Sequence, residues 1–144
     1  MRFYISADIE GIVGVVSREH TGPQGFEYER AREWMTDTVA AACEAAYAAG
    51  ASEIVISDSH GSGQNLKLER LPETVQLVRS SPRPLAMMQG IEVGRYEGAM
   101  FIGYHSGSTA MQGILAHTMR SVSLREVRLN GRVLPEAGDR KSVV

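Results

Sequence analysis

Three stretches of the chain share one pattern, a short apolar run that ends in polar residues and a glycine. Residues 2 to 8 read RFYISAD and are followed by Gly11, residues 52 to 61 read SEIVISDSHG, and residues 98 to 107 read GAMFIGYHSG. Short runs rich in β-branched and aromatic residues predict strands, and near-continuous apolar runs are typical of strands buried in a parallel sheet. We therefore expect three mostly buried strands, each followed by a polar turn.

A long amphipathic helix is expected between the first two strands, over YERAREWMTDTVAAACEAAYAAG, residues 28 to 50. Apolar side chains recur there at three- and four-residue spacing, and acids occupy the other faces. Gly50 stands where a C-terminal cap belongs, and Glu27 and Glu29 lie where the helix dipole favours acids. Strand, helix and strand together predict a βαβ unit with parallel strands.

The remaining sequence predicts smaller elements. Residues 71 to 91 contain Pro72, Pro82 and Pro84, which predict short strands or turns and only a brief helix. Asn130 and Gly131 stand between two alternating runs, a strong signal for a β-hairpin. The predicted fold is a single α/β domain over residues 1 to 144, three-layered, with a mostly parallel central sheet.

Composition narrows the class of protein. Among 144 residues, 43% are hydrophobic and 22% charged, the balance of a soluble globular domain. The net charge is −2 and the basic residues are scattered, which argues against a nucleic-acid partner. No apolar window is long enough for a membrane span, and no signal peptide is recognisable. The single cysteine, Cys43, cannot form an internal disulfide, so we expect a cytoplasmic protein.

Metal-binding side chains follow all three predicted strands. Asp8 and Glu10 follow the first, Asp58 and His60 the second, and His105 the third. Because the carboxyl ends of parallel strands meet at one rim, where ligands bind, we expect these side chains to converge there. Two residues apart on one strand, Asp8 and Glu10 would project from the same face about 7 Å apart. Carboxylates so close repel each other unless a proton or a cation lies between them.

The residue types indicate which cation and how many. Histidines with carboxylates suit zinc, manganese or another first-row ion better than calcium or magnesium, and such binding weakens as the histidines become protonated. Glu136, between Pro135 and Gly138, is a further candidate ligand. Three carboxylates and two histidines exceed the shell of one four-coordinate ion, whereas two divalent ions about 3.5–4 Å apart can share a bridging Asp and a hydroxide.

Each residue also has a simpler explanation. Asp8 and Glu10 can cap a turn or the next helix, and Asp58 is more readily explained as an Asx-turn residue than as a ligand. His105 alone would more often be a hydrogen-bonded histidine, and His117 can be a packed core residue. Other residues are assigned no chemistry: His20 in an exposed-looking loop, and Trp34, Met35, Met87 and Met88 as packing residues. The acid and histidines at successive strand ends favour a metal site.

The motifs around these residues resemble those of the bacterial D-aminopeptidase family, dinuclear zinc peptidases of the dipeptide-transport-operon type. They occur in family order: DIEGI at 8–12, YERAREWMT at 28–36, SDSHG at 57–61, GYHS at 103–106, AHTM at 116–119, and NGR with the following glutamate at 130–138. The resemblance implies two zinc ions bridged by Asp8. It further implies that Glu10 and His60 complete one zinc site, that His105 and Glu136 complete the other, and that His117 is catalytic.

The resemblance also implies an activity, namely removal of N-terminal D-amino acids from small peptides by a ring-shaped decamer with interior active sites. The mechanism expected is attack by a metal-bridging hydroxide, with one zinc polarising the carbonyl and His117 transferring a proton or stabilising the oxyanion. Family members continue into a second half, whereas this sequence ends in PEAGDRKSVV, so it is expected to be a truncated form or a fragment. Alternatives are a metal-dependent hydrolase of another amide or ester, and a metal-binding domain without activity.

Overall fold

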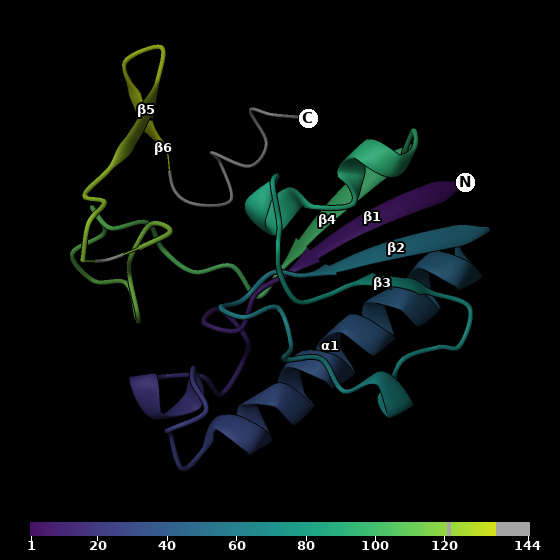
Figure 1. The fold of residues 1–144 in the computed structure, drawn as a ribbon, viewed down its shortest axis with the longest axis horizontal. Coiled ribbons are helices and arrows are strands. Elements are labelled where there is room, and N and C mark those ends of the chain that lie inside the picture. Colours follow the sequence, from purple (N-terminus) through teal and green to yellow (C-terminus); the bar gives the residue numbers. More distant parts are fainter. Residues whose placement is uncertain (121, 135–144) are drawn as a thin grey trace.

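The computed structural model describes residues 1–120 and 122–134 (Figure 1). Its centre is a parallel four-stranded sheet in the order β3-β2-β1-β4. The strands are β1 (Arg2–Ala7), β2 (Glu53–Asp58), β3 (Gln76–Val78) and β4 (Gly98–Ile102). A separate antiparallel hairpin pairs β5 (Val127–Leu129) with β6 (Arg132–Leu134). The predicted α/β class with a parallel central sheet is thus confirmed.

One helix and four short 3-10 helices complete the described elements. These are α1 (Tyr28–Ala48), η1 (Arg18–His20), η2 (Leu68–Arg70), η3 (Ala86–Met88) and η4 (Ile91–Val93). The region from residue 71 to 91 contains only short elements, as its prolines predict. Within the described part of the chain, no helix is both long and apolar enough to cross a membrane.

The alternation of side chains along the strands creates two cores, one on each face of the sheet. Ile5 in β1 and Ile54 and Ile56 in β2 are fully buried with Met35 and Val39 of α1. On the other face, Tyr4, Val55 and Met88 form a smaller cluster, closed by side chains around η3 and η4. The sheet therefore lies between α1 and the segment that carries η3 and η4 (Figure 1).

Helix α1 begins and ends as its sequence predicts. The apolar stripe is buried, and the chain turns at Gly50, whose φ is +95°. Gly50 N donates to Tyr47 O at 2.9 Å and Ala51 N donates to Ala46 O at 2.9 Å, the two bonds of a Schellman motif. Asn130 and Gly131 likewise have φ of 50° and 79°, which confirms the hairpin turn.

The segment after β1 departs from the prediction. Strand β1 ends at Ala7, and the following residues form turns, in which Ile12 N donates to Ile9 O at 3.1 Å. Asp8 and Glu10 therefore do not alternate along a strand, and that explanation of their proximity is wrong. The turn is instead held against β4, because Asp8 N donates to Ile102 O at 2.8 Å and Gly11 N to Gly103 O at 2.7 Å.

His20 also departs from its prediction. It was expected in an exposed loop, but it is only 9% exposed. Its ring stacks on Trp34 with centroids 5.9 Å apart, and its Nδ1 lies 3.0 Å from Ser17 Oγ. Trp34 lies on α1, outside the segment around His20, so a local sequence pattern could not predict this contact.

Asp58 has a structural role in the loop after β2. Its Oδ2 accepts from Asn65 N at 2.6 Å and Leu66 N at 2.8 Å, and its Oδ1 accepts from Asn65 Nδ2 at 2.7 Å. These bonds support the prediction that Asp58 organises the loop rather than binds a metal. They differ from an Asx turn, because they span seven and eight residues. This loop carries His60.

Replacing Asp58 should therefore destabilise the protein. We expect Asp58→Ala to lower the free energy of unfolding by about 2–4 kcal/mol, because it leaves buried N–H groups without acceptors. The matched control is Asp37→Ala, an exposed acid that pairs with Arg70, for which we expect a change of no more than about 1 kcal/mol. Urea unfolding of the metal-free proteins measures both, and equal stability of the two variants would contradict this role.

Gly11 should tolerate no side chain. A Cβ there would lie 2.2 Å from Tyr104 O, so the turn would have to move away from the segment after β4. We expect Gly11→Ala to cost about 1–3 kcal/mol, as overpacking commonly does. Gly22→Ala is the control, since a Cβ at Gly22 has nothing within 4 Å. Thermal unfolding would show the difference, and a Gly11→Ala protein as stable as the control would refute the close approach.

Candidate metal centre

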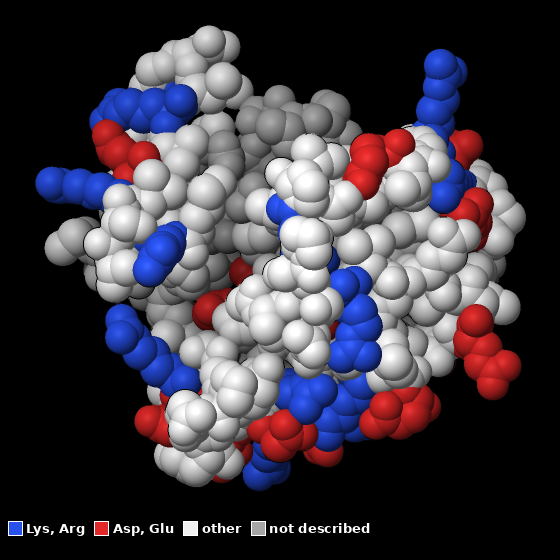
Figure 2. All heavy atoms as spheres, in the orientation of Figure 1, with Lys and Arg blue, Asp and Glu red and all other residues white. Residues whose placement is uncertain are grey.

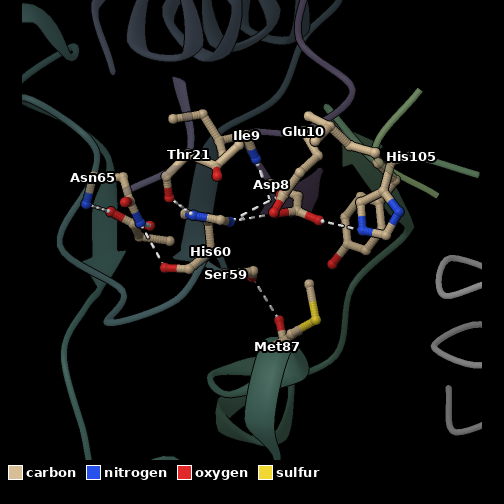
Figure 3. Close-up of polar contacts among 12 residues, drawn as sticks. Asp8, Ile9, Glu10, Thr21, Ser59, His60, Asn65, Met87 and His105 are labelled. Carbon is tan, nitrogen blue, oxygen red and sulfur yellow. Dashed lines mark hydrogen bonds and ion pairs between the residues drawn. The ribbon is translucent and has the colours of Figure 1, made fainter. Parts of the chain in front are cut away.

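Four of the five sequence-predicted ligands, Asp8, Glu10, His60 and His105, lie together at the carboxyl ends of β1, β2 and β4 (Figure 3). Asp8 comes directly after β1, His60 follows β2 and His105 follows β4. Asp8, Glu10 and His105 each offer a ligand atom, and these atoms lie within 4.8 Å of one another. The parallel sheet thus brings side chains far apart in sequence to one rim, as predicted.

Asp8 lies between the two histidines. Its Oδ1 is 3.2 Å from His60 Nδ1, and its Oδ2 is 3.5 Å from His105 Nε2. Ile9 N donates to Oδ1 at 2.9 Å, which fixes the orientation of a carboxylate that is only 2% exposed. A carboxylate with its two oxygens facing different ligands is the arrangement that a bridge between two ions requires.

Glu10 reaches the same point from the turn. Its Oε2 lies 2.9 Å from His60 Nδ1, and its Oε1 lies 3.9 Å from His117 Nε2. Oε2 is buried, and the polar group of the described residues that it faces is the ring nitrogen of His60. A buried carboxylate oxygen of this kind suits coordination to a cation, so the donor set fits a metal.

Backbone carbonyls orient the three histidines of the site. Each ring nitrogen that lies beside a carbonyl donates its N–H, which turns the other nitrogen toward the carboxylates. The pairs are His60 Nε2 to Thr21 O at 2.6 Å, His105 Nδ1 to Ser106 O at 2.9 Å and His117 Nδ1 to Leu115 O at 2.7 Å. These acceptors could not be predicted from the sequence, because every residue has a backbone carbonyl whatever its side chain.

Burial and the pairing of His60 with two carboxylates shift the pKa values of the site. Burial raises the pKa of Asp8 to about 6, against the hydrogen bond from His60. Burial also opposes ionisation of Glu10, but the hydrogen bond and charge of His60 outweigh it and lower the pKa of Glu10 to about 2. Burial alone would lower the pKa of His60, yet the two carboxylates raise it to about 10. A proton on His60 therefore neutralises charge that a metal cation would otherwise balance.

His117 lies at the edge of the site rather than in a packed core. Its ring stacks on His105 with centroids 3.8 Å apart and an interplanar angle of 10°. Its backbone N donates to Ser106 O at 3.1 Å, and its side chain is 20% exposed. Of the six predicted site residues, the structure brings together Asp8, Glu10, His60, His105 and His117, and Glu136 lies outside the described residues.

Comparisons with known proteins agree on one family. The family described as D-aminopeptidase, peptidase M55, matches residues 1–140. The D-aminopeptidase of Bacillus subtilis (strain 168) is 30% identical over 138 residues, which cover 96% of this chain and 49% of that protein. The solved structure of the zinc-dependent D-aminopeptidase DppA from Bacillus subtilis, a self-compartmentalizing protease, is 30% identical. It superposes with a TM-score of 0.89 over 96% of this chain and 49% of its own.

The chain thus spans about half the length of the relatives that it matches. The match to the family nonetheless covers nearly all of it, including every described residue of the site. Sequence, fold and family match agree, and the chain belongs to the D-aminopeptidase family.

Proposed function

We propose that this chain carries the metal centre of a zinc-dependent aminopeptidase that removes the N-terminal residue, a D-amino acid, from small peptides. The observation that carries the proposal is the position of Asp8, whose two oxygens face His60 and His105 with Glu10 and His117 alongside. The names of the two relatives support the metal and the handedness of the substrate. Description of one of them as self-compartmentalizing supports a homo-oligomer.

The ligand assignment that we propose is the one implied by the family resemblance, and the positions of His60 and His105 on opposite sides of Asp8 support it. Glu10 and His60 would hold one zinc ion, His105 and Glu136 the other, with Asp8 between them. Bound zinc would lower the pKa of a bridging water toward about 7 and polarise the scissile carbonyl, which supplies a hydroxide nucleophile near neutral pH. The carbonyls of Thr21 and Ser106, which accept from His60 and His105, would orient the two ligand nitrogens of these histidines.

His117 is the residue of this chain best placed to move a proton. Donation from its Nδ1 to Leu115 O leaves Nε2 directed at the site, 3.9 Å from Glu10 Oε1. Its partial exposure lets a substrate reach it, and the stacked ring of His105 prevents it from turning away. It would transfer a proton to the leaving amine or stabilise the developing oxyanion.

Zinc content tests the metal centre. After loading and dialysis, we expect about two zinc ions per wild-type chain and a loss of at least one from Asp8→Ala, because that variant removes the bridge. Asp37→Ala, outside the site, should retain wild-type content. Elemental analysis of the folded proteins gives the stoichiometry, and unchanged zinc in Asp8→Ala would rule out the assignment.

Turnover tests the role of His117. We expect His117→Gln to keep its zinc but to lose about 10²–10⁴-fold in kcat on D-alanyl peptides, the usual contribution of a general acid or base. His20→Gln controls for loss of another buried, hydrogen-bonded histidine and should keep both zinc and turnover. An His117→Gln enzyme with wild-type kcat would contradict the role.

The wild-type chain also separates the alternatives. Stoichiometric zinc without hydrolysis of any substrate in a panel of D- and L-aminoacyl amides and esters would indicate a metal-binding domain without activity. Hydrolysis of L-aminoacyl or ester substrates in preference to D-aminoacyl amides would indicate a hydrolase of another class. Preference for D-aminoacyl amides would support the aminopeptidase.

A further inference from the structure

Of the cavities lined by residues of the metal centre, two share both Glu10 and His117, so these residues form the boundary between them. The methionine cavity, about 360 Å³, has Asp8 and His60 of the metal centre in its lining, together with Ala86, Met87 and Met119. The arginine cavity, about 270 Å³, adds Arg18, Thr21 and Leu115. Figure 2 shows a hollow in this face with acidic side chains at its base.

The wall of the methionine cavity is held rigidly. Ser6 Oγ donates to Met87 O at 2.9 Å and Ser59 Oγ donates to the same oxygen at 2.8 Å. Both serines are buried, at 0% and 5% exposure, and Met88 is packed with Tyr4 on the sheet. The backbone at residue 87 is therefore fixed to the ends of β1 and β2, while the Met87 side chain extends toward Asp8 (Figure 3).

The arginine cavity has a different chemistry. Arg18 belongs to η1, and its guanidinium has neither a hydrogen bond nor an ion pair with any residue that the structure describes. The described lining of the methionine cavity contains neither Lys nor Arg. An unpaired guanidinium beside a cavity suits a carboxylate, which it can bind through two parallel hydrogen bonds.

We propose that the two cavities divide a peptide substrate between them, and this inference rests on the proposed function. The methionine cavity receives the side chain of the N-terminal residue, and Met87 limits its size. The arginine cavity receives the leaving group, and Arg18 binds its free carboxylate. The residues common to both cavities, Glu10 and His117, then lie beside the scissile bond, where the chemistry requires them.

Phosphinic dipeptide analogues, in which a PO₂–CH₂ unit replaces the scissile amide, test this division without turnover. Four analogues combine a D-alanyl or D-leucyl first residue with a free carboxylate or a carboxamide at the second alanyl residue. Titration calorimetry with zinc-loaded wild type, Met87→Ala and Arg18→Gln gives two affinity ratios, leucyl against alanyl and acid against amide. The controls are Met111→Ala, which alters a methionine that is 97% exposed, and Arg125→Gln, which alters another exposed arginine.

Met87→Ala should change only the leucyl-to-alanyl affinity ratio, and Arg18→Gln only the acid-to-amide ratio. We expect Met87→Ala to shift binding toward the leucyl analogues by about tenfold or more, since a few methylenes in an apolar pocket discriminate to that extent. Arg18→Gln should reduce the preference for the acid by about tenfold, and the control variants should keep both wild-type ratios.

The inference would be overturned if Met87→Ala left the leucyl-to-alanyl ratio unchanged or Arg18→Gln left the acid-to-amide ratio unchanged. It would also be overturned if either variant changed both ratios, or if no analogue bound to the zinc-loaded chain. Hydrolysis of D-alanyl-D-alanine by the wild type is measured separately. Absence of hydrolysis with the two ratios behaving as expected would reject the proposed activity and retain the division of the cavities. Hydrolysis of D-alanyl-D-alanine with unchanged affinity ratios would support the proposed activity and reject the division of the cavities.

Discussion

Asp8 and Glu10 place two carboxylates against one imidazole at a rim where Asp8 is 2% and Glu10 9% exposed. Two anions so close, and so poorly hydrated, repel each other far more strongly than they would in water. A protonated His60 supplies opposing charge, and the two carboxylates raise its pKa to about 10. A bound divalent cation would supply more positive charge at the same point, so metal binding would also stabilise the fold.

The surrounding fold holds these charges together against their repulsion. The turn that carries both acids is hydrogen-bonded to the segment after β4 through Asp8 N and Gly11 N, and Gly11 allows that approach because it has no side chain. Asp58 fixes the loop that carries His60. The site is therefore preorganised by buried backbone and loop contacts, and its geometry does not depend on the long, mobile side chains of surface residues.

The regular elements could be predicted because each has a local cause. The apolar stripe of α1, the cap at Gly50 and the turn at Asn130 and Gly131 all follow from neighbouring residues. The convergence of Asp8, His60 and His105 also followed, because parallel strands share one rim. The turn after Ala7 and the burial of His20 did not, since both depend on contacts with distant segments. The carbonyls of Thr21, Ser106 and Leu115 were equally hidden, because any residue supplies one.

Chemistry and recognition are attached to different parts of the fold. The described metal-centre residues come from turns and loops at the ends of β1, β2 and β4, where backbone contacts and buried hydrogen bonds fix their position. Arg18 and Met87, the residues to which we assign recognition in the two cavities, come from η1 and η3, short elements outside the sheet. A substitution at Met87 or Arg18 changes the shape or charge of a cavity without removing a ligand or an orienting hydrogen bond. Under the proposed function, substrate preference could therefore change while the metal centre stays the same.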